Sequence, residues 1–360
     1  MTVMNKKVIL LIANAASVHT QRTARNLREG GWEVHIASFE HSEIAGVLVH
    51  HIPTLGLGKI GYFLGIWVLR RLKRRIKPTM FHAHHITSNG YISAIAGVRP
   101  LVITAWGSDI LVTPHDSMLK RSFVQHALKG ADAIVVEAEH VREKALALGA
   151  VSSRTHVVSF GVNLSAFRFR RARGEAADFV RIISTRNHLP VYDVSTFIKA
   201  LSIFAMNFSE FEATIAGDGP MRSELEDLTK KLGLDDRVAF VGRVTEEHLG
   251  ALLAESDIFV TTSLSDGENI SLNEAMACGC FPIASAIPAN SVIEDGANGL
   301  LFAPSVPESL SEALMRAIRI RATWPTIVAN NRMKIEMSSN SKDWLGRMEA
   351  IYCEAGKREH

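Results

Sequence analysis

Three acidic side chains interrupt a stretch that otherwise has the composition of a buried helix. The stretch reads SLSDGENISLNEAMACG and contains Asp266, Glu268 and Glu274. It directly follows the apolar run DIFVTT, which predicts a strand, so a strand turns into a helix at this point. The free amides at the start of that helix, at residues 269–271, favour a phosphate group. A carboxylate one or two turns further along suits the hydroxyl groups of a ribose, which makes Glu274 the candidate for that contact.

Other polar loops in the second half of the chain also follow predicted strands. Arg186 comes after the run VRIIS, and an arginine suits a diphosphate because its planar fork donates two parallel hydrogen bonds. Two glycine turns come after the runs EATIA and VAFV, and each alone predicts only a strand-to-helix turn. The candidate residues of these turns are Gly217, Asp218 and Gly219 in the first, and Gly242, Arg243 and Val244 in the second.

The first half offers polar groups at the same kind of position. Ser17 follows the first predicted strand, where it can cap a helix whose amides hold a phosphate or act as a simple cap. Its loop has no glycine and therefore lacks the dinucleotide-binding fingerprint. Two later strands are followed by candidate contacts for substrate hydroxyl groups, namely His84, His85, Trp106, Ser108 and Asp109. The histidines have no acidic or cysteine partner near them in sequence, so we expect no metal.

The elements that would position these residues alternate regularly along the chain. Short apolar runs separated by helical stretches predict βαβ units and parallel sheets covered on both faces. The alternation stops at a polar, basic segment and then restarts, which predicts two doubly wound α/β domains. The expected parts are residues 1–166, a linker at 167–178, residues 179–338, and a terminal helix within 339–360 that packs back on the first domain.

The composition describes an ordinary globular protein. Its 360 residues exceed what one core usually supports, and its net charge of +3 is too small to indicate a nucleic-acid partner. Three cysteines are too few for a disulfide framework, which indicates a reducing compartment. No run reaches the roughly 18 apolar residues of a membrane span. The N-terminal apolar run predicts a first strand rather than a signal peptide.

One segment departs from this pattern. It reads KIGYFLGIWVLRRLKRRIK and joins aromatic residues directly to a basic cluster. One interpretation is a surface helix with cations on its solvated side. The other is an interfacial helix on an anionic membrane, which we favour because aromatic residues directly adjoin the cations. The membrane contacts would be Phe63, Trp67, Arg70, Arg71, Lys73, Arg74 and Arg75.

The whole stretch SLSDGENISLNEAMACGCFPIASAIPANSVIEDGANGLLF closely resembles the signature of the retaining glycosyltransferases of family four. In that family two acids separated by seven residues precede E-A-M-A-x-G, and an E-x-G-x-N-G-L-L turn follows. The segments AGDGPMRSELE, FVGRV and HVVSFGVNLSAF are similar to the same family. SVHTQRTARNLREGGWEVHIASF and HAHHITSNG resemble its members that build surface polysaccharides. The resemblance covers nearly the whole chain.

The resemblance implies a GT-B architecture, in which two Rossmann-like domains face a nucleotide-sugar cleft. It implies that Arg186 holds the diphosphate, Glu274 the ribose, and Asp266, in place of a glutamate, the donor sugar, and these three are the expected catalytic residues. Asn269, Ile270 and Ser271 would lie near the diphosphate. Glu268 does not fit the spacing and is expected to be a bystander.

The implied reaction needs neither a metal nor a cofactor. A hexose passes with retention from a UDP- or GDP-type sugar to a glycan or lipid-linked acceptor, which we expect at the cytoplasmic face of the cell membrane. Three features depart from the family pattern: Val191 and Tyr192 stand where a lysine is usual, Trp106 replaces a histidine, and the first loop reads ANAASV. Two alternatives therefore stay open, a nucleotide-sugar epimerase on the same fold and a catalytically weak binding paralogue.

Overall fold

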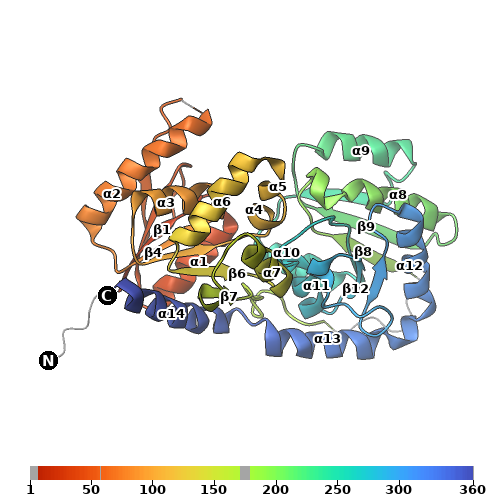
Figure 1. The fold of residues 1–360 in the computed structure, drawn as a ribbon. Coiled ribbons are helices and arrows are strands. Elements are labelled where there is room, and N and C mark those ends of the chain that lie inside the picture. The colour runs from red at the N-terminus through yellow and green to blue at the C-terminus, as the bar shows by residue number, and fades with distance from the viewer. Residues whose placement is uncertain (1–6, 57, 171–178, 360) are drawn as a thin grey trace. The chain divides into compact units, whose positions relative to one another are not determined.

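The computed structural model describes residues 7–56, 58–170 and 179–359, and the chain divides into two compact units (Figure 1). The first unit runs to Ser159 and also contains the terminal segment from Trp344. The second unit is Phe160–Asp343. Each unit is an α/β domain built on one parallel sheet, so the two doubly wound domains predicted from the alternation of elements are confirmed.

The first unit contains a seven-stranded sheet in the order β3-β2-β1-β4-β5-β6-β7. The central strand β1 is parallel to both of its neighbours, and its continuous apolar composition fits a strand that is covered on both faces. The strands are β1 (Val8–Ile12), β2 (Glu33–Ser38), β3 (Leu48–His51), β4 (Met80–His84), β5 (Leu101–Thr104), β6 (Ala133–Val136) and β7 (Thr155–Val157).

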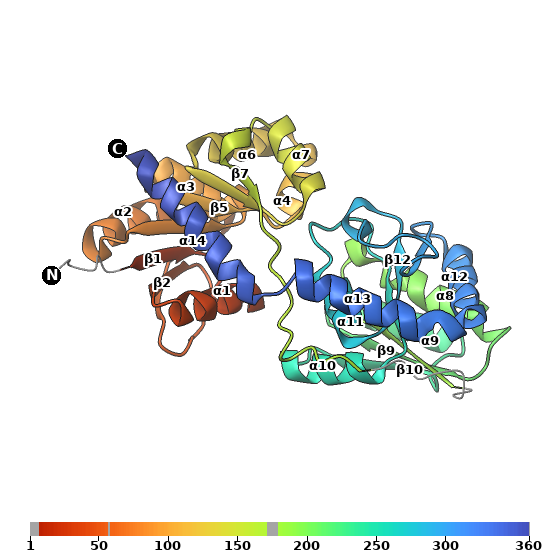
Figure 2. The same cartoon turned by 90° about the horizontal axis from the view of Figure 1, so that it is seen from below.

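Helices cover both faces of this sheet. Phe81 and Ala83 of β4 belong to a core shared with α2, α3 and α6, whereas His82 between them points to the opposite face. There the Tyr352 hydroxyl of α14 lies 2.8 Å from His82 Nδ1, and Figure 2 shows α14 crossing the sheet. The helices are α1 (Val18–Glu29), α2 (Leu64–Ile76), α3 (Tyr91–Ala96), α4 (Ser108–Leu111), α5 (Thr113–Asp116), α6 (Met118–Gly130), α7 (Glu139–Ala147) and α14 (Lys342–Gly356).

The second unit contains a six-stranded parallel sheet in the order β10-β9-β8-β11-β12-β13. Chain order reverses between β8 and β11, and in doubly wound sheets ligands bind at the carboxyl ends of the strands beside such a switch point. The strands are β8 (Val180–Ser184), β9 (Phe211–Ala216), β10 (Val238–Gly242), β11 (Ile258–Thr261), β12 (Phe281–Ser285) and β13 (Leu300–Phe302).

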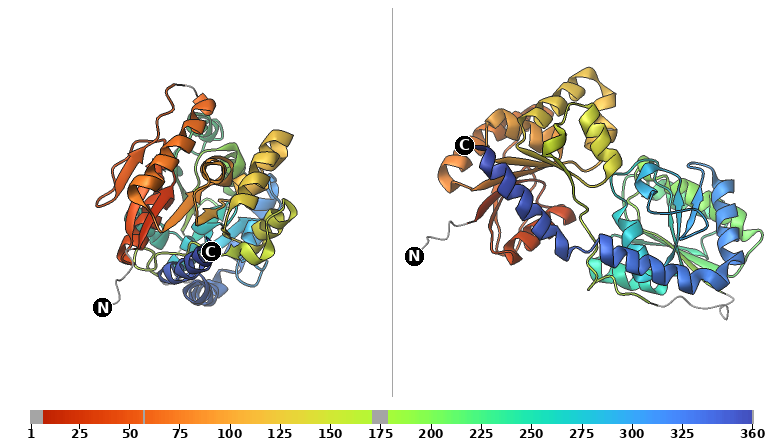
Figure 3. Two further views of the ribbon diagram at one scale, coloured as in Figure 1. Left: turned by 60° about the vertical axis from the view of Figure 1, so that its left-hand side comes forward. Right: turned by 60° about the horizontal axis from the view of Figure 1, so that its bottom comes forward.

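Helices cover both faces of the second sheet (Figure 3). An apolar core lies beneath each layer of helices. Ile182 packs with α8, α9 and α12, and its neighbour Ile183 packs with α10, α11 and α13. Gly279 ends α11 with φ +94°, where a Cβ would approach Arg170 O to 2.3 Å. The helices are α8 (Val194–Ala205), α9 (Arg222–Lys231), α10 (Glu246–Glu255), α11 (Ile270–Cys278), α12 (Pro307–Arg319) and α13 (Trp324–Ser338).

The boundaries of the units differ from those expected from composition. The first unit ends at Ser159 rather than at residue 166, because Val162 pairs with the end of α13 through Ser339 O and Ser341 N. Phe167, which we placed in the linker, is fully buried in the second unit. The rest of that linker, from residue 171, lies outside the described residues. Residues 339–343 belong to the second unit, and the segment from Trp344 belongs to the first.

Candidate functional site

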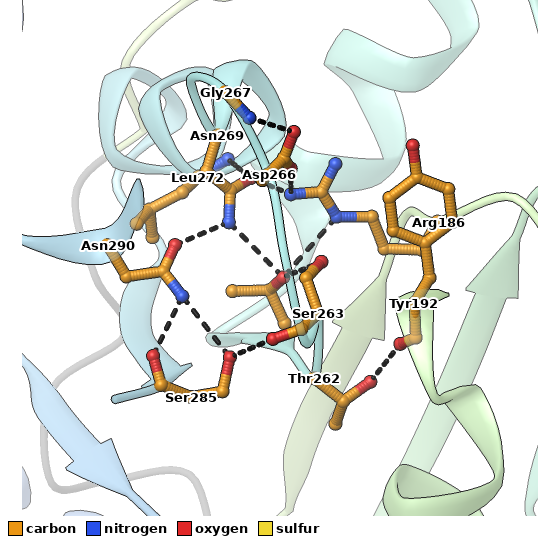
Figure 4. Close-up of polar contacts among 11 residues, drawn as sticks. Arg186, Tyr192, Thr262, Ser263, Asp266, Gly267, Asn269, Leu272, Ser285 and Asn290 are labelled. Atoms are coloured by element: carbon orange, nitrogen blue, oxygen red, sulfur yellow. Dashed lines mark hydrogen bonds and ion pairs between the residues drawn. The ribbon is translucent and has the colours of Figure 1, made fainter. Parts of the chain in front are cut away.

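A buried arginine lies at the carboxyl edge of the second sheet. Arg186 comes two residues after β8, and 8% of its surface is exposed. Its Nη2 donates to Asp266 Oδ2 at 2.8 Å and to Asn269 Oδ1, and its Nε donates to Thr261 Oγ1 at 3.3 Å (Figure 4). Its Nη1 has no hydrogen-bond partner among the described residues. One nitrogen of a firmly held guanidinium is thus left for a ligand.

Asn269 is the centre of this network. Its Oδ1 caps α11 by accepting from Leu272 N at 3.1 Å, in addition to the bond from Arg186. Its Nδ2 donates to Thr261 Oγ1 at 3.2 Å and to Asn290 Oδ1 at 2.7 Å. The side chain of Asn269 is therefore fully used inside the protein, which the sequence did not reveal because Asn290 lies far away in the chain.

Two acids of the loop have protein partners that the sequence did not indicate. Asp266, expected on the donor sugar, makes an ion pair with Arg186. Glu268, expected to be a bystander, accepts from Phe160 N at 3.3 Å and from Asn273 Nδ2 at 3.0 Å. Glu268 therefore ties the loop to the first residue of the second unit, and no rule of local spacing could reveal a partner so far along the chain.

The first turn of α11 has one amide left for a ligand. Ile270 N donates to Glu268 O at 3.0 Å, and Leu272 N is bound by Asn269. Ser271 N, by contrast, has no hydrogen-bond partner among the described residues. Glu274 follows one turn later with 4% of its surface exposed. Of the three amides expected at residues 269–271, only Ile270 N is thus bound by the described residues, and a buried carboxylate follows at Glu274.

Tyr192 occupies the position where a lysine was expected. The Arg186 guanidinium carbon lies 5.2 Å from the centre of its ring, within range of a cation–π interaction. The backbone is fixed as well, because Tyr192 O accepts from Thr262 Oγ1 at 2.7 Å and Val191 O accepts from Leu264 N at 2.8 Å. An aromatic ring therefore supports the arginine in place of a second cation.

The two glycine turns pack against the segment that carries Arg186. A Cβ on Gly217 would approach Arg186 O to 2.1 Å, and a Cβ on Gly219 would approach His188 O to 2.6 Å. Gly217 N donates to Gly242 O at 2.8 Å. The close approach requires glycine at these positions. Of the neighbouring candidates, Asp218 and Val244 are half-buried and Arg243 is exposed.

In the first unit the predicted contact residues gather at the carboxyl ends of β4 and β5. The indole of Trp106 lies 5.4 Å from the ring of His84 and 6.2 Å from that of His85, between ring centres. Asp109 is buried, and Ser108 beside it is exposed. His19, which we did not select, packs on the same indole at 4.6 Å. Ser17 begins α1 nearby in sequence and makes no side-chain cap.

We expect the first unit to lose stability in acid because it buries neutral histidines. Burial lowers the pKa of His82 to about 3 and that of His19 to about 4. The unfolded chain binds a proton on each below about pH 6.5 and the folded chain does not. The unfolding free energy should therefore fall by about 1.4 kcal/mol per pH unit for fully buried His82 as the pH drops below that value.

Urea unfolding of the wild type and of His82→Gln at several pH values tests this. Glutamine can keep the hydrogen bonds to Thr104 and Tyr352 but does not titrate. Below pH 6.5 the unfolding free energy of this variant should change less steeply with pH than that of the wild type, by the equivalent of about one bound proton. Equal slopes in the two proteins would contradict a neutral His82 in the folded state.

The basic-aromatic segment forms α2, and the structure divides its cations into two sets. Arg70 donates to Ile95 O and Ala96 O, and Lys73 donates to Gly97 O, so both bind the end of α3. Arg71, Arg74 and Arg75 have no hydrogen-bond or ion-pair partner among the described residues. With Arg70 and Trp67, which is 74% exposed, they line a shallow hollow of about 450 Å³. Phe63, just before α2, is 44% exposed.

Neither a metal site nor a membrane span is found in the described part of the chain. Cys278 and Cys280 are buried free thiols, and burial raises the pKa of Cys278 to about 12. Among the described residues no cluster of histidine, cysteine and acidic side chains is suited to a metal ion. No helix within the described ranges is long and apolar enough to cross a bilayer.

Comparison with known proteins gives consistent results for both units. Residues 166–334 match the family model of glycosyl transferases group 1, and residues 8–138 match that of glycosyl transferase 4-like proteins. An uncharacterized glycosyltransferase of Methanocaldococcus jannaschii is 22% identical over 95% of this chain and 93% of its own. One subunit of the phosphatidylinositol N-acetylglucosaminyltransferase of Arabidopsis thaliana is 23% identical over 81% of this chain and 65% of its own.

A similar solved structure is that of HepE from Anabaena in complex with UDP-glucose. It superposes with a TM-score of 0.78 at 17% identity and covers 98% of this chain and 99% of its own. At this level of identity the likeness establishes the fold, which agrees with the two parallel sheets described above.

Proposed function

Because the chain belongs to the glycosyltransferases of group 1, we propose that it transfers a hexose from a nucleotide diphosphate sugar to an acceptor hydroxyl group with retention of configuration. The donor is of the UDP or GDP type, and the acceptor is a glycan or a lipid-linked sugar at the cytoplasmic face of the membrane. The observation that carries the proposal is Arg186, whose guanidinium is fixed by three side chains while Nη1 stays unused by the described residues. The UDP-glucose bound by HepE and the lipid acceptor in the name of the Arabidopsis relative support it.

The charges around Arg186 suit a leaving diphosphate. A guanidinium held in place before the reaction stabilises negative charge as it develops and needs no reorganisation. Nη1 of Arg186 and Ser271 N, at the positive end of α11, are donors that the described residues leave for the phosphate oxygens. The ion pair with Asp266 orients the guanidinium and occupies only its Nη2 side.

The reaction balances without a further cofactor. The bond between the anomeric carbon and the phosphate oxygen breaks, and the acceptor oxygen bonds to the same face of the sugar. The acceptor proton passes to an oxygen of the departing diphosphate. The residues of this site bind and position the donor and stabilise the leaving group, which is where such transfer gains most of its rate.

A product assay tests the proposal. The purified chain is incubated with UDP-glucose, UDP-N-acetylglucosamine and GDP-mannose, each with and without octyl glucoside, and the products are followed by NMR. We expect a glycoside with the anomeric configuration of the donor. An inverted product would contradict retention, and an epimerised nucleotide sugar without transfer would support the epimerase alternative.

The free cations of α2 support the location at a membrane. Arg71, Arg74 and Arg75 have complementary charge to anionic phospholipid headgroups, and exposed Trp67 suits the headgroup boundary. Arg70 and Lys73 are left out of this surface because they bind the end of α3. We thus assign three of the five predicted cations to lipid.

Vesicle sedimentation gives a quantitative prediction for this surface. Replacing Arg71, Arg74 and Arg75 together with glutamine should weaken binding to vesicles rich in phosphatidylglycerol by about 10²-fold, since each cation contributes about 1 kcal/mol. The matched control removes three exposed lysines of the second unit, Lys199, Lys230 and Lys231. Equal losses in the two variants, or binding that ignores anionic lipid, would contradict the assignment.

A further inference from the structure

The turn after β4 combines a residue with a strained backbone and an unusual helical turn. His85 has φ +70° and ψ 125°, a conformation that side chains other than glycine rarely adopt. Residues Ile86–Gly90 then form a π-helical turn, which is rare and often found at functional sites. Such strain costs about 1–3 kcal/mol and persists only where the surroundings impose it.

Asp109 is the group that imposes this conformation. Its side chain is 2% exposed, Oδ2 accepts from Ile86 N at 2.7 Å, and Oδ1 accepts from Trp106 N at 3.0 Å. One carboxylate therefore joins the ends of β4 and β5. The backbone of His85 is bound as well, because its N–H donates to Thr104 O at 3.0 Å and its carbonyl accepts from Gly90 N at 2.8 Å.

The strained turn directs the imidazole of His85 at this carboxylate. Nδ1 lies 3.9 Å from Asp109 Oδ2, while 48% of the side chain remains exposed. With Nδ1 facing the acid, Nε2 at the far corner of the ring is the nitrogen available to a ligand. The edge of the ring that carries Nδ1 thus faces the buried carboxylate, and Nε2 lies on the side of the ring away from it.

The other titratable groups around His85 do not offer the same function. His84, at the end of β4, is 3% exposed, and His19 of α1 packs behind the indole of Trp106. Burial lowers the pKa of both well below its usual value, to about 4 for His19, so both are neutral at pH 7. Burial raises the pKa of the Asp109 carboxyl, and His85 and the backbone N–H groups act against that shift.

We propose that His85 and Asp109 form a site that binds a hydroxyl group of the acceptor next to the attacking one, with His85 Nε2 making the hydrogen bond and Asp109 positioning the ring. The Asp109 carboxylate beside the ring disfavours an anionic ligand, so the ligand is a hydroxyl group of the sugar acceptor rather than the donor diphosphate. This inference rests on the proposed transfer reaction. It assigns different roles to two residues that the sequence placed together only as general sugar contacts.

The test compares two substitutions of His85 that differ in which nitrogen they replace. His85→Asn tolerates the positive φ and keeps an amide near Nδ1, but it has no atom at the position of Nε2. His85→Gln can place its amide near Nε2. The donor is whichever of UDP-glucose, UDP-N-acetylglucosamine and GDP-mannose turns over fastest, with octyl glucoside as acceptor, and donor hydrolysis is measured without acceptor.

We expect His85→Asn to lower kcat/KM for octyl glucoside about tenfold, with Tm, donor KM and donor hydrolysis unchanged, and His85→Gln to recover part of the loss. Unchanged kcat/KM for octyl glucoside in His85→Asn would overturn the inference and leave the transfer reaction intact. An equal loss in donor hydrolysis would overturn it as well, because the contact would then be to the donor. A wild type that transfers no sugar would overturn the proposed function together with this inference.

Discussion

Replacing Arg186 with alanine should lower kcat/KM for the nucleotide sugar by about 10²- to 10³-fold. Among the described residues, this guanidinium is the one buried cation in the network at the carboxyl ends of β8 and β11. None of these residues binds its Nη1. Most of the loss should fall on kcat, because negative charge on the diphosphate grows as the sugar departs. The variant also leaves Asp266 without this cation, so the carboxylate would repel the donor.

Two further variants separate charge from geometry. Arg186→Lys keeps the charge but cannot make bonds to Asp266, Asn269 and Thr261 together while lying against Tyr192, so we expect an intermediate loss. The matched control is Arg181→Ala, an arginine of β8, the strand that precedes Arg186, whose side chain pairs with exposed Glu212. If Arg186→Ala stayed within about threefold of Arg181→Ala in steady-state kinetics, the phosphate role of Arg186 would be wrong.

The aromatic support of Arg186 explains how the chain manages without the expected lysine. Lysine would add a second positive charge beside the diphosphate, whereas Tyr192 adds none and instead restricts the orientation of the existing charge. Together with Asp266 and Asn269 it holds the guanidinium from several sides. The missing lysine, which favoured a catalytically weak paralogue, is thus compensated by these contacts to Arg186.

The parallel sheets and the loops that carry the site were predictable because their signals are local. A run such as VILLI is buried along its whole length in β1, and the polar groups after such runs must lie at the carboxyl edge of a parallel sheet. Asn269 and Gly279 begin and end α11 through their own capping chemistry. These features depend on neighbours within a few positions of the chain.

The contacts that were missed all join residues far apart in sequence. Glu268 was set aside on spacing, yet it binds Phe160 N, and Asp266 reaches back to Arg186. The cations of α2 looked equivalent in composition, but the position of α3 separates Arg70 and Lys73 from the others. The partner of a charged side chain depends on where the fold places it, and the periodicity of apolar residues in the sequence does not predict that.

A second large effect is expected at Glu274, where glutamine should raise the KM for the nucleotide sugar by about 10²-fold. The side chain is 4% exposed on α11, and after burial its charge contributes to raising the pKa of the Cys278 thiol one turn later. A ribose offers two hydroxyl donors, and each bond to a charged acceptor contributes about 1.5–3 kcal/mol.

The kinetic constant that changes distinguishes Glu274 from the acids of the preceding loop. Glutamine has the volume of glutamate, so α11 should keep its packing, and the loss should appear in KM because the ribose is bound equally before and during transfer. Glu268→Gln is the matched control, since the bonds of Glu268 described above join it to main-chain and amide donors of the protein itself, at Phe160 and Asn273. Donor KM measured for both variants decides the matter: equal values would remove Glu274 from the ribose, whereas a selective rise at Glu274 would show that the buried acid of α11 contacts the donor.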